Sequence, residues 1–179
     1  MTSTARIRRA HLSDAAAIAQ VHTQSWRETY ARNLPGQFLD GLQFSSQEWT
    51  SRIQETSTSR SRRAIWVAED DDGIVGFAAV GPDPEEETAG RLYSIYLLSR
   101  AQGTGVGRRL HTAALQSLAE AGFTQATLWV AADNAAAIRF YELADWRADF
   151  VQRSEDIGGV SLRLVRYRLP LAPSAATRR

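Results

Sequence analysis

The spacing of apolar positions predicts an amphipathic helix near the start of the chain and a series of short strands after it. Ile18, Val21 and Trp26 lie on one helical face. Ser13 is placed to cap this helix, because its hydroxyl can accept a hydrogen bond from the first turn. The turn sequence Asp70-Asp71-Asp72-Gly73 joins two apolar runs and predicts an antiparallel hairpin. The predicted strands are 5–9, 64–68, 74–80, 91–98, 124–132, 147–153 and 160–169, and the later predicted helices are 38–42, 47–55, 105–121 and 134–143.

The order of these elements predicts an α/β domain built on one mixed sheet. Antiparallel strands come first, and a strand–helix–strand unit over 91–132 follows, which places helices on both faces of the sheet. Residues 57–63 and 82–87 are polar or proline-rich and are predicted to be loops. We therefore expect a single domain over residues 1–169 and a flexible tail over residues 170–179.

A glycine-rich sequence, Gln102-Gly103-Thr104-Gly105-Val106-Gly107-Arg108, joins a predicted strand to the longest predicted helix. Backbone N–H groups and the positive end of the helix dipole point at one place there, which suits an anion such as a pyrophosphate. Glycine lets the backbone approach the phosphate closely. The spacing matches neither a P-loop, which needs a lysine that this chain lacks, nor a Rossmann fingerprint. Taken alone, the glycines could also form a turn without a ligand.

A second motif lies farther along the chain: Asn134-Ala135-Ala136-Ala137-Ile138-Arg139-Phe140-Tyr141, followed by Trp146. Together the two motifs resemble the GNAT superfamily of N-acetyltransferases, which pairs a Gln/Arg-x-x-Gly-x-Gly/Ala loop with an Asn-x-x-Ala-x-x-Phe-Tyr segment. The motifs and their flanks cover Arg91 to about Phe150. Asp145 departs from the family, which usually has glycine before the aromatic residue.

The resemblance implies a GNAT-like fold and acetyl-CoA as cosubstrate. The sheet is then predominantly antiparallel, has about six or seven strands, and is splayed where acetyl-CoA binds. The backbones of Leu97 and Leu98 would pair with the pantetheine amides like an added strand, and the side chain of Gln102 would brace the loop. Asn134 would cap the following helix and lie near the pantetheine arm. The residues assigned to the cofactor are Leu97, Leu98, Gln102, Gly103, Thr104, Gly105, Val106, Gly107, Arg108 and Asn134.

Tyr141 occupies the position where the family places a phenol beside the thioester sulfur. A departing thiolate needs a proton or a hydrogen bond, and a phenol with a pKa near 10 can supply either without being ionised at neutral pH. We therefore expect Tyr141 to act as the general acid, with a purely structural core aromatic as the alternative. The chain contains no cysteine, so the acetyl group is expected to pass directly to the acceptor in a ternary complex.

The general base is not identified by the sequence. Many family members carry a glutamate at the position that is Arg91 here, and arginine stays protonated at any useful pH. The base could instead be Tyr93, Glu28, Asp40 or Glu69; water could carry the proton away; or the acceptor amine could have a low pKa. The residues assigned to the acceptor side are Trp26, Tyr30, Arg91 and Tyr93.

Arg91 supports two expectations about the acceptor. If its guanidinium faces the cleft, acceptors with a negative group near the amine are favoured. If it points away, it pairs with Glu85, Glu86 or Glu87 instead. The acceptor itself is expected to be a primary amine of a small molecule. A noncatalytic acyl-CoA-binding module and a protein N-terminal acetyltransferase remain alternatives.

The composition of the chain bears on nucleic-acid binding, cellular location and metal binding. The 179 residues are 44% hydrophobic and carry a net charge of +1, which does not favour nucleic-acid binding; Arg60, Arg62 and Arg63 are read as a solvated loop. No apolar run approaches a membrane span and no signal peptide is evident, so a cytoplasmic protein is expected. His11, His22 and His111 are scattered, so no metal site is expected; His111 is assigned to the polar side of its helix. A homodimer is possible.

Overall fold

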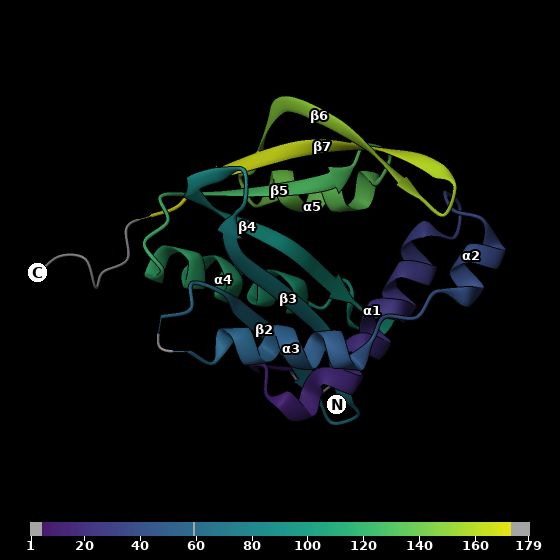
Figure 1. Ribbon diagram of the computed structural model, residues 1–179, viewed down its shortest axis with the longest axis horizontal. Coiled ribbons are helices and arrows are strands. Elements are labelled where there is room, and N and C mark those ends of the chain that lie inside the picture. The colour runs from purple at the N-terminus through teal and green to yellow at the C-terminus, as the bar shows by residue number, and fades with distance from the viewer. Residues whose placement is uncertain (1–4, 59, 173–179) are drawn as a thin grey trace, which may run out of the picture.

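A computed structural model describes residues 5–58 and 60–172 and contains one seven-stranded sheet in the order β1-β2-β3-β4-β5-β7-β6. Helices cover both faces of this sheet (Figure 1). The strands are β1 (Arg6–Arg9), β2 (Ala64–Asp70), β3 (Gly73–Asp83), β4 (Glu86–Leu97), β5 (Gln125–Ala131), β6 (Arg147–Ile157) and β7 (Val160–Pro170). The helices are α1 (Ala15–Tyr30), α2 (Gly36–Gly41), α3 (Ser46–Thr56), α4 (Val106–Glu120) and α5 (Ala135–Leu143), with short 3-10 turns at Leu12–Asp14 and Ser99–Ala101.

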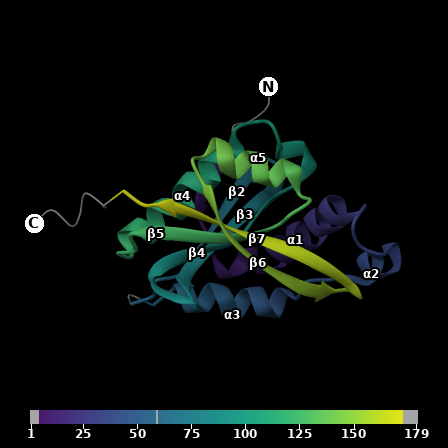
Figure 2. The same ribbon diagram turned by 90° about the horizontal axis from the view of Figure 1, so that it is seen from above.

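The predicted mixed α/β sheet, mostly antiparallel and flanked by helices, is confirmed. Strands β1 to β4 are antiparallel, β5 runs parallel to β4, and β7 and β6 complete the sheet in antiparallel order. Helices α1 and α3 pack on one face through a core around Ile18, Trp49 and Phe77. Helix α4 packs on the opposite face, so the two halves of the core lie on either side of the sheet (Figure 2).

The sheet splits between β4 and β5. These two strands pair only over Ala89–Arg91 and Gln125–Thr127, and β5 then continues against β7 alone. Parallel pairing therefore ends at Arg91, while β4 runs on to Leu97 with one edge unpaired. The result is a V-shaped opening between the end of β4 and β5.

A β-bulge in β4 sets which side chains face each side of the sheet. Leu92 pairs with Val80 and Ser94 with Ala79, so Tyr93 is an extra residue in the ladder. Because side chains alternate along a strand, one extra residue reverses the alternation beyond it. Leu92 and Ile95 consequently both pack toward α4, and Tyr96 packs on the α1 side instead.

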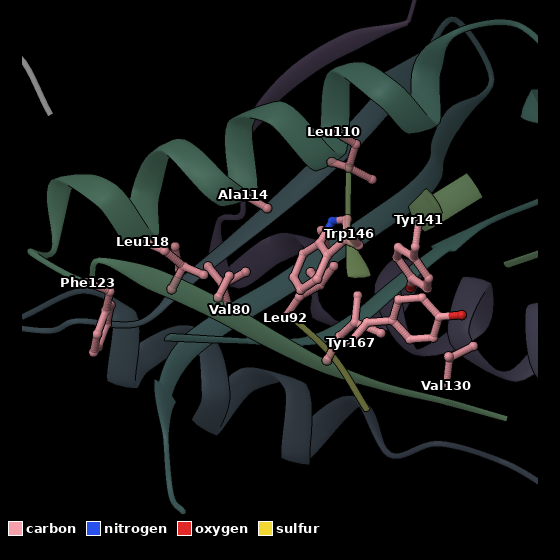
Figure 3. Packing of buried hydrophobic residues seen from close by; sticks show 14 residues of the cluster. Val80, Leu92, Leu110, Ala114, Leu118, Phe123, Val130, Tyr141, Trp146 and Tyr167 are labelled. Carbon is pink, nitrogen blue, oxygen red and sulfur yellow. The ribbon is translucent and has the colours of Figure 1, made fainter. Parts of the chain in front are cut away.

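The core beneath α4 is built around Trp146, which is fully buried (Figure 3). Leu110, Ala114 and Leu118 of α4 point toward it and toward the sheet. The indole Nε1–H of Trp146 donates to Nε2 of His111 at 2.9 Å. The prediction that His111 lies on the polar side of α4 is therefore wrong: the residue is 5% exposed, and its Nε2 has a hydrogen-bond partner in Trp146, from the turn before β6.

Several predicted boundaries also need correction. Residues 82–87 form a tight hairpin, because β3 extends to Asp83 and β4 already begins at Glu86. Ser13 does not cap α1, since it lies inside the 3-10 turn that precedes the helix. Of the predicted tail, Pro170 belongs to β7, and residues 173–179 lie outside the described residues. No helix in the described ranges is long and apolar enough to cross a membrane.

Candidate functional site

A cleft of about 690 Å³ occupies the opening between β4 and β5. Three elements supply its walls: the last turn of α1, the end of β4 with the glycine-rich loop, and the first turns of α5. The two sequence motifs, which are separate in the chain, therefore meet in one cavity. The residues that line the cleft include Glu28, Thr29, Ile95, Tyr96, Leu97, Ser99, Gln102, Gly103, Gly105, Gly107, Arg108, Asn134, Phe140 and Tyr141.

The glycine-rich loop has the geometry of an anion site. Gly103 and Gly105 have φ values of +74° and +83°, and a Cβ atom on either would meet nothing within 4 Å. Gly105 precedes α4, and the first amide that bonds back within the helix is that of Arg109, to Gly105 O at 3.2 Å. The N–H groups of the first turn before it are therefore free for a ligand, at the positive end of the helix dipole.

The side chains of the loop stabilise its shape. Gln102 Nε2 donates to Leu97 O at 3.2 Å, so Gln102 braces the loop against the end of β4. The hydroxyl of Thr104 donates to Ala101 O at 2.6 Å. Val106 is buried, so its backbone rather than its side chain is available to a ligand. Arg108 is exposed at the rim of the cleft, where its positive charge suits a phosphate.

The unpaired edge of β4 offers Leu97 but not Leu98. Leu98 N–H donates to Val75 O at 2.8 Å, and Leu98 O accepts from Ala101 N–H at 2.9 Å. This bond makes Leu97 and Gly76 a non-hydrogen-bonded pair, so the N–H and C=O of Leu97 point away from β3. The C=O already accepts from Gln102 Nε2, so the N–H is the group that Leu97 offers to a ligand. The expectation that Leu98 pairs with an added strand is therefore wrong, because its backbone is already bonded within the chain.

Tyr141 projects from α5 into the cleft. Asn134 caps this helix, since its side chain accepts a hydrogen bond from Ala137 N–H at 3.1 Å. The Tyr141 ring packs edge-on against Trp146, with centroids 6.0 Å apart. Burial, together with the nearby Tyr30 hydroxyl, raises the pKa of Tyr141 well above its usual value. The phenol is therefore neutral at physiological pH and retains its proton for donation.

An aromatic wall of Trp26 and Tyr30 lies beside the cleft on the α1 side, but neither residue is among those that line the cleft, so their assignment to the acceptor side stays a prediction. Trp26 and Tyr30 of α1 pack with ring centroids 4.8 Å apart. Burial raises the pKa of Tyr30 and of Tyr96, and the charges of the neighbouring Tyr30 and Tyr141 raise the pKa of Tyr96 further. Sequence reasoning missed Tyr96, which lines the cleft. Its position became interpretable only with the bulge at Tyr93, which turns Tyr96 toward α1.

Arg91 and Tyr93 do not face the cleft, which corrects their assignment to the acceptor side. Arg91 is 6% exposed, and its Nη2 lies 2.8 Å from Asp83 Oδ1 and 3.3 Å from Glu85 Oε1. Asp83 also accepts from the hydroxyl of Thr127, so this cluster joins β3, β4 and β5 where the sheet splits. The hydroxyl of Tyr93 donates to Pro82 O at 2.5 Å, outside the cleft.

Among the carboxylates considered as the base, Glu28 is the one that lines the cleft. Its Oε2 accepts from the Ser99 hydroxyl at 2.6 Å and its Oε1 accepts from Gln24 Nε2 at 2.9 Å. Both donors are uncharged, so they orient the carboxylate without acting as a counterion. Glu69 is bound to Arg8 at 2.9 Å on β1, and Asp40 is exposed on α2. Within the described residues, no cluster of three or more His, Asp or Glu could hold a metal.

The split mixed sheet, the glycine-rich helix N-terminus and the buried phenol together suit an enzyme that uses an extended, phosphate-bearing cosubstrate. The family model described as "Acetyltransferase (GNAT) family" matches residues 23–145. The chain belongs to the GNAT family and is an acyl-CoA-dependent N-acetyltransferase.

Relatives match over most of the chain. The uncharacterized N-acetyltransferase YuaI of Bacillus subtilis is 35% identical over 162 residues, which are 89% of each chain. The probable N-acetyltransferase Rv2775 of Mycobacterium tuberculosis is 30% identical over 168 residues, which cover 93% of this chain and 94% of that one.

A solved structure supports the same fold. YncA of Salmonella typhimurium, described as "a putative acetyltransferase" with its cofactor acetyl-CoA, superposes with a TM-score of 0.74 at 20% identity, and the match covers 97% of this chain and 99% of that one. At this level of identity the likeness shows the fold, that is, the arrangement of the strands and helices.

Proposed function

We propose that the cleft binds acetyl-CoA and that the enzyme transfers the acetyl group directly to a primary amine in a ternary complex. The residues present fit this cosubstrate. The free N–H groups after Gly105, at the positive end of the helix dipole, and the guanidinium of Arg108 at the rim suit the pyrophosphate, because both present positive charge to it. The N–H of Leu97, which points into the split, suits a carbonyl of the pantetheine arm, which would pair with this strand edge as another strand would.

The observation that carries the proposed chemistry is the position of Tyr141. Its buried phenol lines the same cleft as the glycine-rich loop and the open edge of β4. Tyr141 holds its proton at neutral pH, because burial raises its pKa, and donates it as the carbon–sulfur bond breaks, so that the sulfur leaves as a thiol. Trp146 and its bond to His111 hold the ring in place from the core side.

Glu28 is the carboxylate best placed to take the proton from the amine. A primary amine with a pKa of about 10.4 is only ~0.04% neutral at pH 7, so deprotonation costs roughly 4.6 kcal/mol. Glu28 lines the cleft, and Ser99 and Gln24 orient its carboxylate without neutralising it. In this proposal Glu28 attracts the ammonium form and accepts its proton, directly or through water.

The charges around the aromatic wall favour a cationic small-molecule amine. Glu28 is the carboxylate that lines the cleft, and Asp133 lies near the Tyr30 hydroxyl beside it; Glu155 is also nearby but is paired with Arg153 at 2.7 Å. Arg91, which would have favoured anionic acceptors, is paired with Asp83 away from the cleft. A protein N-terminal amine is the second candidate, because it too is a cation.

The test compares Tyr141→Phe with Tyr167→Phe. Tyr167 is also a buried phenol of the same core, but its hydroxyl bonds to Glu142 at 3.1 Å outside the cleft. With acetyl-CoA and a panel of amines, Tyr141→Phe is expected to lower kcat by about 10²-fold and leave the calorimetric affinity for acetyl-CoA unchanged. The control is expected to retain its kcat. Unaltered turnover in Tyr141→Phe would refute the general-acid role, and binding without turnover in the wild type would indicate a noncatalytic module.

A further inference from the structure

Leu97 contributes a side chain as well as a backbone N–H to the end of β4. The side chain is half-buried and packs against a small core that includes Ala101 and Val106, on either side of the glycine-rich loop. Gly76 lies opposite Leu97 in the β3–β4 ladder, and a Cβ atom on Gly76 would lie 2.8 Å from Tyr96 O and 2.9 Å from Leu97 Cγ. The φ angle of Gly76 is not positive. The space taken by β4 and the Leu97 side chain, and not the backbone conformation, therefore calls for glycine here.

Helix α4 meets the far end of the same side chain. A Cβ atom on Gly107, in the first turn of α4, would lie 3.3 Å from Cδ1 of Leu97 and 3.7 Å from Cε2 of Phe140 on α5. All three residues line the cleft. The three elements β4, α4 and α5 thus come together at one point in the cleft wall, and the Leu97 side chain fills the space between β3 and α4 there.

The two groups that suit the cosubstrate belong to different elements. The N–H of Leu97 is on β4, whereas the free N–H groups after Gly105 are on α4. Gln102 Nε2 donates to Leu97 O at 3.2 Å and ties the strand end to the loop. The Leu97 side chain adds packing between the strand end and the first turn of the helix. Its length therefore affects the distance between the two groups.

We propose that the Leu97 side chain is a spacer that sets this distance for the two ends of acetyl-CoA. The proposal rests on the proposed function, because it requires the pantetheine arm at β4 and the pyrophosphate at α4. A molecule held at two places gains affinity from its own linkage only when the spacing of those places matches its length. The side chain of Leu97 is then a positioning residue for the cosubstrate, acting through the distance between β4 and α4.

The first test compares Leu97→Ala with Leu98→Ala. Leu98 is a matched control, because it is also half-buried but packs with the core beneath α1 and α3 and keeps its backbone bonds within the chain. The probes are acetyl-CoA and ADP, which carries a pyrophosphate without the pantetheine arm. By calorimetry, Leu97→Ala is expected to weaken acetyl-CoA binding about tenfold and to leave ADP binding within about twofold of the wild type. Leu98→Ala is expected to leave both affinities within about twofold.

Two results of this comparison would overturn the proposal. One is wild-type acetyl-CoA affinity in a folded Leu97→Ala protein, and the other is an equal loss of affinity for ADP, which would assign the effect to the loop alone. If Leu97→Ala does not fold, Leu97→Val takes its place, with an expected loss of about threefold for acetyl-CoA because only the end of the side chain is removed.

The second test refills the space from the helix. Gly107→Ala adds one methyl group 3.3 Å from Cδ1 of Leu97, so it presses on the leucine and is expected to weaken acetyl-CoA binding by about threefold. In the Leu97→Ala background the same methyl group occupies part of the vacated space, so the double variant is expected to bind acetyl-CoA more tightly than Leu97→Ala alone. A double variant that binds no better would show that Leu97 acts only through its own contact with the cosubstrate, and would overturn the spacer. A failure of the proposed function would differ, since the wild type itself would then not bind acetyl-CoA.

Discussion

Arg91 offers a prediction whose size follows from its burial. Arg91 and Asp83 are 2.8 Å apart, their side chains are 8% and 0% exposed, and Asp83 also accepts from Thr127. Truncating Arg91 to alanine removes the positive partner and leaves the Asp83 carboxylate buried. Removing one member of a buried pair costs about 3–5 kcal/mol, because the remaining charge is no longer compensated.

This cost converts into a measurable change in Tm. For a chain of this size 1 kcal/mol corresponds to roughly 2–4 °C, so Arg91→Ala is expected to lower Tm by about 6–20 °C. Arg91→Glu is expected to be worse, since it places a third carboxylate beside Asp83 and Glu85. Its expected effect is loss of the folded protein rather than a reversal of acceptor preference.

The assay is thermal unfolding followed by circular dichroism, with Arg147→Ala as the control. Arg147 lies 3.8 Å from Asp145 with both side chains largely exposed, and such a pair contributes about 0–1 kcal/mol. A Tm for Arg91→Ala as close to the wild type as that of the control would refute the structural role. So would a stable Arg91→Glu protein that prefers cationic amines over anionic ones more strongly than the wild type does.

Three further predictions concern stability and the loop. Burial lowers the pKa of His111 to about 4 and that of His22 to about 3, so between these values and pH ~6.5 the two imidazoles bind protons in the unfolded chain but not in the folded protein. The free energy of unfolding should therefore fall by ~1.4 kcal/mol per pH unit per histidine as the pH drops from 6.5 toward these values. Urea denaturation that gives the same free energy across this pH range would contradict the prediction. Asp145 has φ +65°, so Asp145→Gly should raise the unfolding free energy by about 1 kcal/mol, and a lower midpoint in urea would count against backbone strain. Gly105→Val should abolish calorimetric acetyl-CoA binding while the circular dichroism spectrum is retained, and a folded variant with wild-type affinity would exclude the loop as the pyrophosphate site.

The motif residues were predictable because their chemistry is local. The cap formed by Asn134 and the left-handed backbone at Gly105 follow from residue types at fixed offsets along one stretch of chain. Even Asp145, which replaces the usual glycine, adopts the left-handed conformation that the position requires. Local interactions of this kind leave a direct trace in the sequence.

The errors concern residues whose position depends on distant partners. His111 looked like a surface residue because its bond to Trp146 comes from another part of the chain. Tyr93 was assigned to the acceptor side and Tyr96 was overlooked, because a bulge depends on how β4 pairs with β3, which alternation within one strand does not reveal. Arg91 occupies the position at which many family members carry a glutamate, so it was assigned to the acceptor side. Its partner Asp83 belongs to β3, in a segment that was predicted to be a loop, so the ion pair was not predicted.

In the proposed reaction Tyr141 protonates the departing sulfur. The most direct measurement is single-turnover acetyl transfer by wild type and Tyr141→Phe, using acetyl-CoA and an acetyl thioester analogue whose thiol has a lower pKa. A better leaving group needs less protonation, so the defect of Tyr141→Phe should shrink from about 10²-fold with acetyl-CoA to a few-fold with the analogue. A defect of the same size with both donors would contradict the account and would assign Tyr141 to packing alone.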